Sequence, residues 1–138
     1  MKRLTVIALV LLAGCSQLQQ DADAEAGRVA DHVMPGALTD AISTAGARTP
    51  ESRVAAAEQW LSDPGPSAID SQGHVAWKVV ASEGTSIRVD VYTYVESASF
   101  FPPDQGDATW GVACRSYAVA ATVTTATVEC PDGTPEEP

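Results

Sequence analysis

Two histidines, His32 and His74, are the side chains of this chain whose type most often serves in acid–base chemistry. Either one has the chemistry of a general base. His32 lies beside an apolar stripe with helical spacing, and His74 follows Gly73 at the start of an alternating segment. An isolated histidine is more often a satisfied surface or boundary residue than a catalytic one. We therefore predict no catalytic role for either.

Serine and phosphate chemistry lack their usual motifs. A nucleophile elbow reads G-x-S-x-G, and the two nearest segments, Gly65-Pro66-Ser67-Ala68-Ile69 and Gly84-Thr85-Ser86-Ile87-Arg88, both lack the final glycine. The chain has no S-x-x-K, no H-E-x-x-H and no glycine-rich loop that would cradle a phosphate. The sequence thus predicts a protein that is not an enzyme, with no catalytic residues and no cofactor.

Carboxylates flank a glycine in Asp104-Gln105-Gly106-Asp107, a pattern that could suit a hard cation such as calcium. The ligand spacing of an EF-hand and its closing glutamate are both missing. An acidic turn explains the segment better, and we predict no metal site.

The N-terminus has the three regions of an export signal. Lys2 and Arg3 are basic, residues 4–12 are apolar except for one threonine, and small residues follow. The apolar run is too short to be a permanent transmembrane helix. Leu12-Ala13-Gly14-Cys15 resembles the lipobox of bacterial lipoproteins, L-[AS]-[GA]-C, at all four positions. The alternative is an ordinary secretory signal followed by a chance cysteine.

The lipobox resemblance implies lipidation of Cys15 by a diacylglyceryl group and cleavage after Gly14. Two acyl chains would give a lasting membrane anchor, since each buried methylene contributes about 0.8 kcal/mol and one chain alone binds only marginally. The expected location is the extracytoplasmic face of the cell membrane. The expected partner is the membrane, through the lipid on Cys15, and another envelope protein is a second candidate partner.

With Cys15 assigned to lipid, Cys114 and Cys130 are left as a pair, and export favours a disulfide between them. If the chain reverses near residues 121–123, the two sulfurs lie opposite each other in a hairpin. Such a bond should stabilise the fold by about 3 kcal/mol. Two free buried thiols, or half of a metal site, are the alternatives.

Acidic residues dominate the charge of the chain. The formal net charge is −10, and removal of residues 1–14 would also take away two of the eight basic residues, which gives −12. This charge disfavours binding to nucleic acid and to anionic headgroups. The remaining 124 residues are enough for one domain.

The mature chain divides into a helical half and a strand half. Apolar residues at helical spacing over residues 22–33 predict a first helix that ends at Pro35-Gly36, and residues 37–45 predict a further short helical piece. Thr49-Pro50-Glu51 is typical of a helix start, and the helix that follows ends at Asp63-Pro64-Gly65-Pro66. Val54, Ala57 and Leu61 would share its buried face, with Trp60 beside them.

Apolar residues then alternate with polar ones, and this two-residue period predicts four strands. The first two alternate over residues 75–81 and 87–95 around a turn at Ser82-Glu83-Gly84, and the last two form the cysteine hairpin. The predicted fold class is α+β, with two or three N-terminal helices packed on a four-stranded antiparallel sheet. This element order resembles cystatin-like or NTF2-like folds.

The predicted organisation is a signal peptide over residues 1–14, a lipidated N-terminus and short tether over 15–20, one α+β domain over 21–130 and a disordered acidic tail over 131–138. The alternative is that the tether merges with the first helix. Cys114-Arg115-Ser116-Tyr117 and Val128-Glu129-Cys130-Pro131, together with a composition that lacks asparagine, resemble small actinobacterial lipoproteins of unknown role.

Two surfaces are candidates for binding a partner. Phe100 and Phe101 lie in an apolar, proline-rich connection, although the preferred explanation is that they cap the open end of the core. Tyr92 and Tyr94 alternate with the apolar residues of their strand and so face outward, which is also ordinary for strand residues. The functional hypotheses, in order of preference, are a non-catalytic binding or accessory module, a structural lipoprotein of the envelope without a small ligand, and a small envelope hydrolase.

Overall fold

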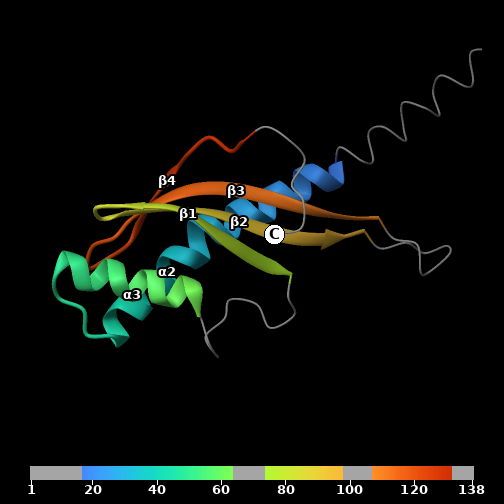
Figure 1. Ribbon diagram of the computed structural model, residues 1–138. Coiled ribbons are helices and arrows are strands. Elements are labelled where there is room, and N and C mark those ends of the chain that lie inside the picture. The colour runs from blue at the N-terminus through green and yellow to red at the C-terminus, as the bar shows by residue number, and fades with distance from the viewer. Residues whose placement is uncertain (1–16, 64–73, 98–106, 132–138) are drawn as a thin grey trace, which may run out of the picture.

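The computed structural model describes residues 17–63, 74–97 and 107–131. It confirms the α+β class: a long helix and a shorter one pack on a four-stranded antiparallel sheet (Figure 1). The likeness to cystatin-like or NTF2-like folds stays a prediction. Residues 17–20, expected in a tether or merged with the first helix, are helical.

The first helix runs without interruption from residue 17 to residue 44. It contains a π-helical turn, η1 (Val29–Val33), and continues as α2 (Met34–Thr44). Its buried face carries residues three or four positions apart, as an amphipathic helix requires. They are Ala22, Ala26, Val29, Ala30, Met34, Leu38 and Ile42.

The prediction that this helix ends at Pro35-Gly36 is wrong, and the π turn is the reason. Proline has no N–H, and within an α-helix its ring collides with the preceding turn. In η1 the Met34 N–H bonds to the Val29 carbonyl, five residues back, so the wider turn accommodates Pro35. The Ala30 carbonyl, whose partner in this register would be the missing N–H of Pro35, accepts a hydrogen bond from the Tyr117 hydroxyl at 2.8 Å.

The second helix, α3 (Pro50–Ser62), begins where the sequence predicts. The Thr49 side chain accepts from the Ser52 N–H, and the Ser52 hydroxyl accepts from the Thr49 N–H, which forms a capping box. Ala57, Trp60 and Leu61 are buried, as expected.

The sheet has the order β1-β2-β3-β4, and every neighbouring pair is antiparallel. The strands are β1 (Val75–Glu83), β2 (Ser86–Glu96), β3 (Ala108–Ala118) and β4 (Thr124–Thr127). The helices cover one face, which we call the helix-covered face (Figure 1). Its core residues on β2 and β3 are Ile87, Val89, Val91, Ala113 and Tyr117.

Gly111 sets how closely the first helix approaches β3. A Cβ atom at this position would collide with the backbone carbonyl of Ala22. The same Ala22 carbonyl accepts a hydrogen bond from the Thr93 hydroxyl at 2.8 Å. The helix backbone therefore lies directly on β2 and β3, without a layer of side chains between them.

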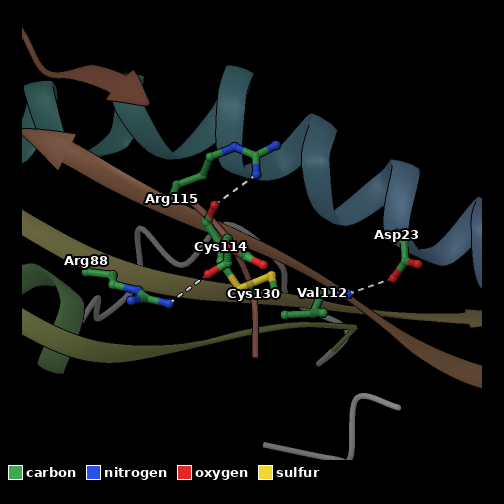
Figure 2. Close-up of a disulfide and its surroundings, with 7 residues drawn as sticks. Asp23, Arg88, Val112, Cys114, Arg115 and Cys130 are labelled. Atoms are coloured by element: carbon green, nitrogen blue, oxygen red, sulfur yellow. Dashed lines mark hydrogen bonds between the residues drawn. A yellow bond between two sulfur atoms is a disulfide. The ribbon is translucent and has the colours of Figure 1, made fainter. Parts of the chain in front are cut away.

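Because β4 pairs only with residues 115–118, the rest of β3 has an open edge, which the first helix covers. Gln19 donates to the Trp110 carbonyl at 3.1 Å and accepts from the Thr109 hydroxyl at 2.9 Å. The Asp23 carboxylate accepts from the Val112 N–H at 3.0 Å (Figure 2). The N-terminal end of the helix is thus fixed to the beginning of β3.

Candidate binding surface

Alternate residues of β1, β2 and β3 point away from the helices and form what we call the outer face of the sheet. Pairing brings these residues side by side: Tyr92 lies opposite Ala76 and Val112, and Tyr94 lies opposite Trp110. The other members are Lys78, Arg88, Asp90, Cys114 and Ser116. The structure thus places Tyr92 and Tyr94 where the alternation predicts. Their role in binding stays a prediction.

Aromatic rings gather at the end of this face that lies next to residues 17–20. The ring centroids of Tyr94 and Trp110 are 5.3 Å apart, with an interplanar angle of 52°. His74 continues the row, 6.0 Å from Tyr94. Tilted pairs of this kind are favourable beyond their buried area. Tyr94 and Trp110 are both half-buried, so part of each ring lies at the surface.

Asp90 lies in the middle of the outer face and is only 7% exposed. Its Oδ1 atom is buried and has no hydrogen-bond partner among the described residues. Burial raises the pKa of the Asp90 carboxyl, and the positive charges of Arg88 and Lys78 only partly oppose this effect. Burial, with the charge of Asp90, also raises the pKa of the neighbouring Tyr92 hydroxyl.

The far end of the outer face is closed by the C-terminal segment. Cys114 and Cys130 form the predicted disulfide (Figure 2). The Val128 N–H donates to the Cys114 carbonyl at 3.2 Å, and the Arg88 guanidinium donates to the Glu129 carbonyl at 3.0 Å. Because Arg88 lies on β2, this segment reaches from β4 past β3, and the disulfide holds it there.

The two histidines lie on different elements. His32 is an exposed residue of the first helix, and His74 is exposed just before β1. Among the residues that the structure describes, no group of three or more histidine, cysteine or acidic side chains could hold a metal ion.

Several predicted features fall wholly or partly outside the described residues. The signal peptide of residues 1–14, Cys15 and residues 132–138 of the acidic tail lie outside them. Phe100 and Phe101 lie outside them, as do residues 104–106 of the acidic turn. Asp107 is described, and its backbone pairs with Ser97, the Ser97 N–H donating to the Asp107 carbonyl at 2.7 Å.

Sequence reasoning missed a cavity of about 470 Å³ between α2 and α3. Alanines form much of its wall, Trp60 lines it, and Asp40 and Asp63 contribute the charge. Trp60 also stacks on Trp77, with centroids 5.3 Å apart, and the Trp77 indole donates to the Leu61 carbonyl at 2.8 Å. The pattern of small residues on α2 was the available signal, but it does not reveal how far apart two helices stand.

Family models, curated proteins and solved structures were all compared with this chain, and none of them matches it. Within residues 17–63, 74–97 and 107–131, no helix is long and apolar enough to span a membrane.

Proposed function

We propose that the chain is a lipoprotein of the bacterial cell envelope, anchored through Cys15 to the extracytoplasmic face of the membrane. Its folded body acts as a non-catalytic binding or accessory module. The lipobox supports the anchor. The Cys114–Cys130 disulfide supports an oxidising compartment, because such bonds persist outside the cytoplasm.

The outer face of the sheet is the observation that carries the binding function. The described helices all pack on the opposite face. Two half-buried tyrosines, an adjacent tryptophan and a buried carboxylate remain on a rigid, disulfide-closed surface. Aromatic rings with polar tips are the side chains enriched in protein interfaces.

A structural envelope lipoprotein without a small ligand is the second candidate. The close packing of the first helix on β3 favours this candidate, because a mechanical force on Cys15 would be transmitted directly to the sheet. A small hydrolase is the third. Such an enzyme needs an acid or a base with a shifted pKa in a cavity. The pKa of Asp90 on the outer face is raised, but Asp90 is not among the residues lining the α2–α3 cavity.

Membrane fractionation tests the anchor. The wild-type chain, expressed in a host that lipidates exported proteins, should lose residues 1–14, gain the mass of a diacylglyceryl group and sediment with membranes. Cys15→Ala should do none of these. Equal membrane retention of the two forms would contradict the proposal.

Capture from detergent-solubilised membranes tests the binding module. Tyr92→Ser should lose a partner that the wild type retains, and Arg48→Ser, on an exposed connection on the helical side, should keep it. Thermal unfolding of both variants establishes that they are folded. Retention of every partner by Tyr92→Ser would favour the structural alternative.

A further inference from the structure

The N-terminal end of the first helix and the aromatic end of the outer face are held together by the hydrogen bonds of Gln19. Gln19 contacts both Thr109 and Trp110, and one helical turn later the Asp23 carboxylate accepts a hydrogen bond from the Val112 N–H. Only Ser16 stands between Cys15 and the first described helical residue, Gln17. The proposed anchor is therefore very close in sequence to a fixed point of the fold.

The length of this connection sets the distance from the membrane. Four residues from Cys15 to Gln19 span at most about 14 Å when fully extended, and about 6 Å when helical. The headgroup region on each side of a bilayer is about 5–7 Å thick. Trp110, bonded through its carbonyl to Gln19 at 3.1 Å, is then within reach of that region.

The other two tryptophans lie on other elements, Trp60 on α3 and Trp77 on β1. Trp60 lines a cavity with Ala37 and Ala41 of α2, and Trp77 stacks on Trp60. About 20 residues of helix separate Gln19 from this position, which corresponds to about 30 Å along the axis. Figure 1 shows the same separation, with the start of the helix at one end of the molecule and the α2–α3 pair at the other.

We propose that the end of the sheet bearing Trp110 and Tyr94 is a membrane-contacting surface, so that the molecule stands on the bilayer with its α2–α3 end pointing away. This inference rests on the proposed lipid anchor. Amphipathic aromatic rings are the side chains enriched at the headgroup level. The partner is the lipid surface itself, and the contact orients the rest of the outer face.

The charges at this end specify the kind of lipid. Asp21, Glu96 and Asp107 are exposed there and would repel anionic headgroups. The contact is therefore made by the rings and not by basic residues. It should be stronger on a zwitterionic bilayer than on an anionic one.

Tryptophan fluorescence tests the proposal on the lipidated full-length mature protein. The protein is reconstituted into phosphatidylcholine vesicles whose acyl chains carry bromine near the headgroup, where bromine quenches a nearby indole. Part of the emission should be quenched in the wild type. The quenched part should disappear in Trp110→Phe and persist in Trp60→Phe, the control that lies beside Ala37 and Ala41 of α2. Vesicles rich in phosphatidylglycerol should quench less.

Lengthening the connection between Cys15 and the first helix provides a second test. Inserting about ten glycine and serine residues after Ser16 adds a flexible link of about 17 Å, so quenching of Trp110 should fall while the protein stays with the vesicles. Equal quenching in the wild type and Trp110→Phe, or none in a wild type that sediments with the vesicles, would overturn the orientation and leave the anchor standing. A Cys15→Ala form that binds vesicles like the wild type would instead overturn the anchor, and the orientation with it.

Discussion

The two faces of the sheet are built from the same strands but treat their buried polar groups differently. On the helix-covered face, Thr93 and Tyr117 both donate hydrogen bonds to backbone carbonyls of the first helix. On the outer face, Asp90 is also buried, yet its Oδ1 atom has no partner within the described part of the chain. Buried atoms without a partner are not confined to the outer face, because among the described residues the Thr125 Oγ1 atom, paired in register with Tyr117, also lacks one.

The carboxylates of the two faces make the same contrast. Asp31, on the first helix, receives two hydrogen bonds from Arg115 at 2.7 and 3.0 Å, and these lower the pKa of its carboxyl. For Asp90, burial raises the pKa instead. Buried polar groups are normally hydrogen-bonded, so an Asp90 Oδ1 atom without a partner among the described residues is a feature that the fold itself does not explain.

Gly111→Val should have the largest effect, because its side chain would collide with the backbone of the first helix. We expect a loss of about 3 kcal/mol or more in the free energy of unfolding, measured by urea titration. Gly36→Ala is the matched control. This exposed glycine of α2 has open space around it, so alanine should stabilise the helix by about 0.5–1 kcal/mol. A tolerated Gly111→Val would mean that the helix does not lie on the strand.

Loss of the disulfide should be next in size. Cys114 and Cys130 are separated by 16 positions, and closing such a loop stabilises by about 3 kcal/mol. In urea titrations, Cys114→Ser/Cys130→Ser should lower the free energy of unfolding by that amount. Hydrogen exchange should accelerate at Val128, whose N–H bonds to the Cys114 carbonyl, and stay slow in the first helix. Unchanged exchange at Val128 would show that the disulfide is not what holds this segment.

Tyr117→Phe tests the π turn. It removes the hydrogen bond to the Ala30 carbonyl and leaves that buried group unpaired, which should cost about 2 kcal/mol. Because alanine supplies the N–H that Pro35 lacks, Tyr117→Phe should cost less in a Pro35→Ala background. A double-mutant cycle measures the coupling. Additive effects would contradict this explanation of the turn.

Asp90→Asn should raise the free energy of unfolding at pH 7 by about 1 kcal/mol, because it removes a buried charge. Since folding raises the pKa of Asp90, the native state binds its proton more tightly. Stability therefore falls as the pH rises from the ordinary carboxyl pKa through the raised one. Asp31 has the opposite sign: its lowered pKa gives stability that is present above the ordinary carboxyl pKa and lost on acidification.

Urea titrations of Asp90→Asn and Asp31→Asn between pH 3 and pH 8 separate the two contributions. Asp31→Asn should cost less than about 1 kcal/mol, because this ion pair is partly exposed. Identical pH profiles for the two variants would remove the contrast between the faces.

Regular patterns made most of the fold predictable. The two-residue period located all four strands, and the cysteine spacing gave the disulfide. The prediction that Cys130 lies on the last strand is wrong, because β4 ends at Thr127 and the segment after it crosses toward Arg88 of β2. Proline chemistry gave the start of α3 but misplaced the end of the first helix, because a π turn and a distant tyrosine hydroxyl together accommodate Pro35. Such compensation comes from residues far apart in sequence, which local propensity does not register.

The candidate surface was predictable only in outline. Alternation placed Tyr92 and Tyr94 on the outward side of their strand. The same alternation would make Asp90 an exposed residue, whereas its neighbours on both adjacent strands enclose it. The contacts of Gln19 and Asp23 with β3 were invisible in the sequence, since they depend on the path of the helix across the sheet edge.

The claim at the centre of this account is that the outer face binds a partner while the helix-covered side serves only the fold. A photo-crosslinking amino acid in place of Tyr92, with Ala55 on the exposed side of α3 as the matched position, tests it in living cells. We predict a discrete adduct with one envelope component from position 92 and none from position 55. Adducts from position 55 alone, or from neither position, would contradict the claim.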